Sequence, residues 1–140
     1  MASRRRLARI AVMQTLFERD FHNGHPSESS SEAPEAILVR NLTEAEGDVD
    51  REFAASLLQG IEERAEDIRE AMRSHAPQWP LARMDRMTRS ILMIGTYELL
   101  HSGDVPPAVV MNEAIDIAKE FGGEEGGKFV NGVLNAIAHD

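Results

Sequence analysis

The sequence of 140 residues carries a formal net charge of −9 and contains no cysteine. This length fits one domain with a single hydrophobic core, and the lack of cysteine excludes disulfide bonds, a thiolate nucleophile and thiolate-bound zinc or iron–sulfur centres. Charged residues interrupt every apolar stretch well before the roughly 18 residues that a membrane span needs. We therefore expect one domain over residues 1–140, located in the cytoplasm and without a membrane span.

Apolar residues recur at helical spacing along nearly the whole chain, and no stretch shows the alternation typical of a β-strand. A first helix is predicted over about residues 4–22, and its expected buried face is formed by Leu7, Ile10, Ala11, Gln14, Phe17 and Phe21. The Asn, Gly and Pro residues at 23–26 end this helix. Residues 27–35 are expected to form an exposed linker, and residues 36–46 a short helix.

A longer helix is predicted from a cap at Asp48 or Asp50 to the residue before Pro77. Trp79 and Pro80 then predict a turn, followed by a central helix over residues 84–101 in which Gly95 allows close helix packing. The prolines at 106 and 107 begin the next helix, and the glycine-rich residues 122–127 are expected to form a flexible connector to the last one. The predicted class is all-α, with about six to seven helices.

Positive charge is concentrated at the start of the chain. Residues 1–19 contain five arginines and one glutamate, a net charge of +4, which leaves −13 for residues 20–140. Arginine outnumbers lysine by 13 to 2, and its planar guanidinium suits phosphate contacts and stacking on bases, although a high-GC codon bias explains the same excess. The overall acidity argues against binding to nucleic acid, whereas the segregation of charge allows it at one end.

Several segments resemble the transcription antitermination factor NusB family. They are TYELL (96–100), DVP (104–106), MNEAIDIAKEFG (111–122) and KFVNGVL (128–134), together with RRRLAR (4–9), which is similar to that family's first helix. The resemblance covers about residues 4–21 and 53–138, and residues 22–50 add no support. It implies a NusB-like fold of two packed helical bundles.

The resemblance also implies a function without catalysis or a cofactor. Members of the family bind the boxA element of nascent ribosomal RNA together with NusE, a small-subunit ribosomal protein. The pair then joins other Nus factors on RNA polymerase and suppresses termination during rRNA synthesis. Family members occur as monomers and as dimers, so a homodimer is one expected state.

The family's basic RNA-binding motif matches Arg4, Arg5, Arg6 and Arg9. Each arginine can neutralise a phosphate and release condensed counterions, whereas the alternative interpretation is a frayed tail that only aids solubility. Changing Arg5, Arg6 and Arg9 together to alanine is expected to keep the helical content and to lower the salt slope of RNA binding by roughly two.

Other RNA-binding residues follow from the resemblance. Lys128, Phe121 and Phe129 correspond to the edge of the family's RNA surface, where the last helix begins near the first. Core packing is the alternative for both phenylalanines, because each fits an apolar stripe. Gln14, expected on the buried side of the first helix, is interpreted either as an internal hydrogen-bonding group or as a base contact.

The family's surface for its protein partner includes the start of the helix predicted over residues 84–101. The candidates there are Asp85, Arg86 and Thr88, and Arg83, Arg86 and Arg89 form a basic stripe at helical spacing. An acidic residue is usual in the family where this chain has Thr88, and Asp85 lies on the same helix face and is a possible substitute.

No motif predicts catalysis or metal binding. Glu124 and Glu125 lie on a glycine-rich stretch with no fixed separation, and the five histidines show neither HExxH spacing nor clustered carboxylates. Similar helical domains occur fused to rRNA methyltransferases, but 140 residues leave no room for an additional cofactor-binding α/β domain. The main alternative function is a helical adaptor that binds only proteins, with a disordered arginine segment.

Overall fold

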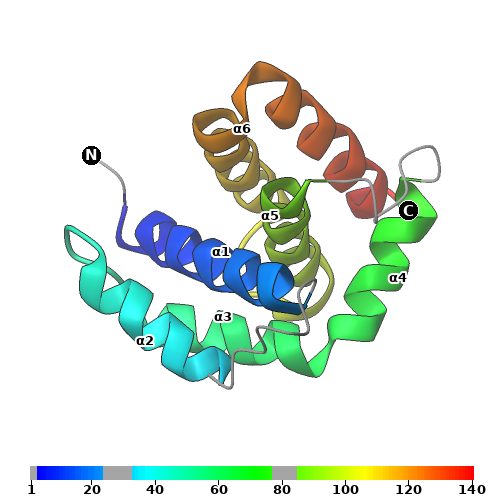
Figure 1. Ribbon diagram of the computed structural model, residues 1–140. Coiled ribbons are helices and arrows are strands. Elements are labelled where there is room, and N and C mark those ends of the chain that lie inside the picture. Colours follow the sequence, from blue (N-terminus) through cyan, green and yellow to red (C-terminus); the bar gives the residue numbers. More distant parts are fainter. Residues whose placement is uncertain (1–2, 24–32, 77–84) are drawn as a thin grey trace. The chain divides into compact units, whose positions relative to one another are not determined.

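The structure is a computed structural model that describes residues 3–23, 33–76 and 85–140. These residues form six α-helices and one π-helical segment, and they contain no β-strand, which confirms the all-α prediction (Figure 1). The elements are α1 (Arg4–Asn23), α2 (Pro34–Glu44), α3 (Arg51–Glu63), α4 (Ala65–His75), α5 (Arg86–Tyr97), η3 (Glu98–Ser102) and α6 (Pro107–Ala138). Across these ranges, none of the helices combines the length and apolar character needed to cross a bilayer. Trp79, Pro80 and Arg83 lie outside the described residues.

The chain divides into two compact units, Met1–Gln59 (unit 1) and Gly60–Asp140 (unit 2). Unit 1 contains α1, α2 and most of α3, and unit 2 contains the end of α3 and all later elements. Two helical groups agree with the predicted fold of two bundles. The assignment of residues 1–140 to one domain stays a prediction.

In unit 1, α1 and α2 lie side by side and run in opposite directions (Figure 1). A buried polar network joins them: the Asn41 side-chain amide donates to Thr15 Oγ1 at 3.1 Å and to Glu18 Oε2 at 2.9 Å. Arg40 Nη1 donates to Glu18 Oε1 at 3.0 Å. Because each of these side chains has a hydrogen-bond partner, the bonds offset the cost of desolvation, and the network fixes the pairing of the two helices.

Asp50 caps α3, as the sequence predicted, because its Oδ1 accepts a hydrogen bond from the backbone N–H of Phe53 at 3.0 Å. The helix predicted to continue to residue 76 is interrupted, and this part of the prediction is wrong. Arg64 separates α3 from α4 with φ −115° and ψ 19°. Its neighbours include neither proline nor a C-terminal glycine cap, so the local sequence carries no signal for the break.

In unit 2, α5 packs against α4, η3 and α6. Gly95 allows α5 and α6 to pack closely, since a Cβ at this position would lie 2.8 Å from Cδ1 of the fully buried Leu134. The prediction that Gly95 allows close helix packing is therefore confirmed. A Cβ on Gly60 would overlap the ring of Tyr97, so the end of α3 also needs glycine to contact α5.

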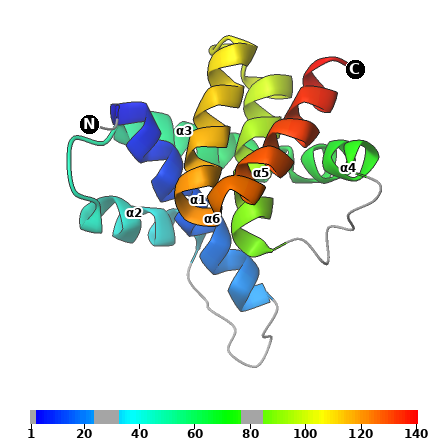
Figure 2. The ribbon, with the colours of Figure 1, turned by 90° about the horizontal axis from the view of Figure 1, so that it is seen from above.

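The glycine-rich residues 122–127 are helical apart from one residue, and the prediction of a flexible connector is wrong. Gly123 alone has non-helical backbone angles, φ 74° and ψ −173°, in the left-handed range that favours glycine. Figure 2 shows that α6 reverses direction at this bend and continues as a second arm. The arms meet beside the bend, where a Cβ on Gly127 would lie 2.6 Å from Cγ of Lys119.

The His75 ring joins the end of α4 to the last residue of the chain. Its Nδ1 lies 2.7 Å from the Ala71 carbonyl oxygen, and its Nε2 lies 2.8 Å from Asp140 Oδ2. The hydrogen bond to Ala71, and then the Asp140 carboxylate, raise the pKa of His75 above 6.5, while burial opposes the rise. Two acceptors favour the imidazolium, which has two N–H donors.

Because the pKa of His75 is higher in the folded state, its contribution to stability is full below pH 6.5 and is lost as pH rises through the folded pKa. We expect the free energy of unfolding to fall between about pH 5.5 and about pH 8.5 by more in the wild type than in His75→Gln. Urea denaturation at the two pH values measures the difference. Equal pH dependence in both proteins would contradict the assignment.

Candidate nucleic-acid interface

The first turn of α1 gathers three consecutive arginines, Arg4, Arg5 and Arg6, here called the arginine cluster. Ser3 caps the helix: its Oγ accepts a hydrogen bond from Arg6 N at 3.0 Å, and its carbonyl oxygen accepts one from Leu7 N at 3.0 Å. The helix has therefore begun at Arg4, and the segment is not a frayed tail.

The charge of this turn is unfavourable for the helix itself. No acidic residue lies in the first turn of α1, so the cations of the arginine cluster adjoin the positive end of the helix dipole. Helix stability favours acidic residues at such a position, so the cluster does not stabilise α1 through the helix dipole. The combined positive potential suits an anionic ligand.

Phe53, at the start of α3, lies under two of the α1 arginines. The Arg5 guanidinium carbon is 4.5 Å from the centroid of the Phe53 ring, and that of Arg9 is 4.9 Å from it, within the range of cation–π attraction. Nothing in the local sequence indicates that a residue 44 positions after Arg9 supports its side chain.

Arg9 corrects the sequence interpretation, because only 3% of this residue is exposed. Its guanidinium stacks on Phe53 inside unit 1, where a phosphate cannot reach it in this conformation. The exposed members of the motif are Arg4 and Arg5, whose side chains are 60% and 51% accessible, while Arg6 is half-buried. Arg9 is better interpreted as a residue that fixes the geometry beside the arginine cluster.

Two aspartates from the loop between α2 and α3 contact the arginine cluster. Asp48 Oδ2 lies 2.8 Å from Arg4 Nε, and Asp50 Oδ2 lies 3.9 Å from Arg5 Nε. The sequence pattern predicts these aspartates only as alternative caps of the helix that follows. Their pairing with α1 depends on the path of the loop, which the sequence pattern does not specify.

Gln14 is exposed, so its predicted position on the buried side of α1 is wrong. The buried face of this helix is instead formed by Ala8, Arg9, Ala11, Val12, Met13, Thr15 and Leu16, and Leu7 and Ile10 of the predicted face are only half-buried. Gln14 falls outside the buried face, as does Phe17, which is 36% exposed. Exposure removes the interpretation of Gln14 as an internal hydrogen-bonding group and leaves it available to a ligand.

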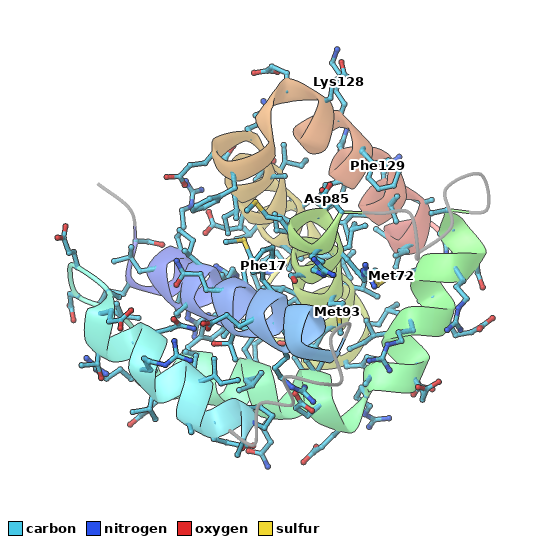
Figure 3. The ribbon with its side chains drawn as sticks, in the orientation of Figure 1. Phe17, Met72, Asp85, Met93, Lys128 and Phe129 are labelled. Carbon is cyan, nitrogen blue, oxygen red and sulfur yellow. The ribbon has the colours of Figure 1, made fainter. Side chains whose placement is uncertain are left out.

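In unit 2, the bend of α6 carries the other predicted RNA-binding residues. Lys128 is exposed and projects outward beside the bend, and the half-buried Phe129 follows it on the second arm (Figure 3). Phe121, just before the bend, is 38% exposed, which argues against core packing for this residue. Lys119 reaches across Gly127, so the two lysines of the chain lie at one bend. Glu124 and Glu125 are exposed there as well.

At the start of α5, two of the three predicted protein-binding residues, Asp85 and Thr88, form hydrogen bonds with each other. Asp85 caps the helix, since its Oδ1 accepts from Thr88 N at 2.9 Å and its Oδ2 accepts from Thr88 Oγ1 at 2.7 Å. Thr88 is only 8% exposed, which contradicts its assignment as a surface contact. Asp85 itself is exposed and Arg86 is half-buried, so the accessible part of this surface is the cap residue and its neighbour.

No set of three or more potential metal-binding side chains gathers within residues 3–23, 33–76 and 85–140. The chemistry that the described residues offer is recognition of an anion: guanidinium groups in a capped helix turn, and lysines at a helix bend. The two groups of residues belong to different units.

Comparison with known proteins identifies the family. The NusB family model matches residues 6–139. The transcription antitermination protein NusB of Geobacter sulfurreducens is 38% identical over 134 residues, which is 96% of this chain and 93% of that protein. The protein of the same name from Bacillus cereus strain B4264 is 39% identical, covering 96% of each chain.

Solved structures agree with these relatives. Thermotoga maritima NusB superimposes with a TM-score of 0.82 at 35% identity, covering 100% of this chain and 94% of that one. A chain from a complex of the antitermination factors NusB and NusE with double-stranded RNA gives a TM-score of 0.82 at 26% identity, covering 99% and 98%. With a family match over nearly its whole length, relatives above 30% identity and the same fold, this chain belongs to the NusB family.

Proposed function

We propose that this protein is a transcription antitermination factor that binds the boxA element of nascent rRNA transcripts together with NusE and acts in the cytoplasm without catalysis. In this role it promotes processive rRNA transcription, with other Nus factors and RNA polymerase as indirect partners. The observation that carries the proposal is the arginine cluster, an exposed, helix-capped cationic turn on a chain of net charge −9. The solved complex of NusB and NusE with RNA supports the choice of partners.

The candidate RNA-binding residues are expected to make different kinds of contact, according to their chemistry. Arg4, Arg5 and Arg6 would neutralise phosphates, because guanidinium groups form charge-assisted hydrogen bonds with phosphate oxygens. Gln14 offers both a donor and an acceptor for a base edge. Lys128 would add a phosphate contact in unit 2, and the exposed faces of Phe121 and Phe129 would support unstacked bases.

The proposal is tested by fluorescence-anisotropy titration of a short boxA RNA at physiological salt, with a scrambled RNA of the same composition as control. Each titration is run with and without purified NusE. Binding that prefers boxA and tightens with NusE is the expected result. Equal binding of the two RNAs would contradict sequence recognition, and absence of RNA binding with retained NusE binding would instead support an adaptor that binds only proteins.

The NusE surface is proposed to include the start of α5, where Asp85 both caps the helix and presents an exposed carboxylate. Asparagine is also a good N-cap, whereas alanine is not. Asp85→Asn is therefore expected to keep stability and to weaken NusE binding about twofold to fivefold. Asp85→Ala is expected to lose about 1 kcal/mol of stability in addition.

Calorimetric titration with NusE and urea denaturation measure the two effects of the Asp85 variants separately. If Asp85→Asn binds NusE with the affinity of the wild type, Asp85 acts only as a helix cap and the NusE surface does not include it.

A further inference from the structure

The loop between α2 and α3, residues 45–50, holds a carboxylate against the arginine cluster. From this geometry, we propose that Asp48 is an intramolecular competitor of RNA: it occupies Arg4 in the free protein, and a phosphate must displace it. The inference rests on the proposed RNA-binding function and adds a residue that sets the affinity of the site. The interaction joins Asp48 Oδ2 to Arg4 Nε at 2.8 Å.

Two contacts with α1 and one buried side chain fix the loop, so the position of Asp48 follows from the fold. Gly47 has φ +98°, and a Cβ on it would lie 3.2 Å from Cδ1 of Leu7; a side chain here would meet both strain and crowding. Val49 is 6% exposed and anchors the loop in the core. The backbone N–H of Asp50 donates to the carbonyl oxygen of Arg4 at 3.2 Å.

The two aspartates of the loop differ in how readily a phosphate would replace them. Asp50 is tied to the N–H of Phe53 as the cap of α3, lies 3.9 Å from Arg5 Nε, and has a side chain only 24% accessible. The side chain of Asp48 is 79% accessible and lies much closer to its arginine. Asp50 is therefore a structural residue, whereas Asp48 can swing into solvent at little cost to the fold.

Competition follows from the shared chemistry of carboxylate and phosphate. Both are anionic acceptors for a guanidinium donor, and Arg4 Nε has one N–H, which Asp48 occupies in the free protein. Exposed ion pairs are weak, so Asp48 lowers RNA affinity without preventing binding. Removing its charge is expected to tighten binding of boxA RNA roughly twofold to fivefold.

The test compares Asp48→Asn with Glu46→Gln by anisotropy titration of boxA RNA over a series of salt concentrations. Both changes remove one negative charge from the same loop. Glu46 is exposed and forms no ion pair with the described part of the chain, so it is the matched control for general repulsion. Circular dichroism checks that all variants fold.

Asp48→Asn is expected to bind more tightly than Glu46→Gln, because the phosphate no longer has to displace a carboxylate from Arg4. In an Arg4→Ala background, Asp48→Asn is expected to have no larger effect than Glu46→Gln. Equal effects of the two changes in the wild-type background, or an undiminished Asp48 effect without Arg4, would overturn the inference while leaving the proposed function intact. Absence of wild-type boxA binding would remove both.

Discussion

Alanine in place of Arg5 and Arg6 is expected to weaken boxA binding on the order of a hundredfold at physiological salt. Each change removes a guanidinium from the first turn of α1, and a hydrogen bond to a charged group is worth about 1.5 kcal/mol or more, roughly tenfold in affinity. Two lost phosphate contacts also lower the log–log salt slope by about 1.4. Anisotropy titrations at several salt concentrations measure both quantities.

Arg9→Ala is the matched control for this pair, because Arg9 belongs to the same motif but is buried on Phe53. It is expected to lower stability by about 1 kcal/mol through the lost cation–π and packing contacts and to leave the salt slope unchanged. The triple change of Arg5, Arg6 and Arg9 therefore combines two effects, and its salt slope reflects only the loss of Arg5 and Arg6. A salt slope unaltered in Arg5→Ala/Arg6→Ala would place the RNA site elsewhere.

Leu134→Ala is expected to cost about 2 to 5 kcal/mol of unfolding free energy. The Leu134 side chain is fully buried and packs directly on Gly95, so its removal leaves a cavity in the core of unit 2. Gly95→Ala is expected to cost about 1 kcal/mol, since overpacking against Leu134 exceeds the gain in helix propensity. Urea denaturation curves with matched m-values measure each loss.

The double variant Gly95→Ala/Leu134→Ala separates packing from other causes. The alanine methyl at 95 would occupy part of the space that Leu134 vacates, so the double variant is expected to lose about 1 kcal/mol less than the two single losses combined. Additive losses would show that Gly95 and Leu134 do not share one packing site.

Helix positions were predictable where local chemistry decides them. The apolar repeat located α1 to within one residue at its end, and Asp50 and Pro107 set the starts of α3 and α6. Two features were missed because their causes are not local. The break at Arg64 has no glycine or proline beside it. The bend in α6 occurs at Gly123 alone, and the sequence does not show which glycine of residues 122–127 adopts the non-helical conformation.

The candidate site was predictable in its charge but not in its geometry. The arginine run and its cap at Ser3 are consecutive in sequence, and the structure shows them in one helix turn. Burial of Arg9 requires Phe53, and pairing of Arg4 requires Asp48; both partners lie on other elements and more than 40 residues away. Gln14 was misplaced because the buried face of α1 is centred on Ala8, Val12 and Leu16 rather than on the side that the apolar pattern indicated.

The proposed RNA-binding surface is tested most directly by mapping bound boxA RNA onto the protein with a ¹⁵N-resolved NMR titration, using the scrambled RNA as control. We expect boxA to shift the amide signals of Arg4–Arg6 and of Lys128, with little change along α4. Shifts confined to α4, or identical shifts with the scrambled RNA, would contradict the claim that the arginine cluster and the bend of α6 bind boxA.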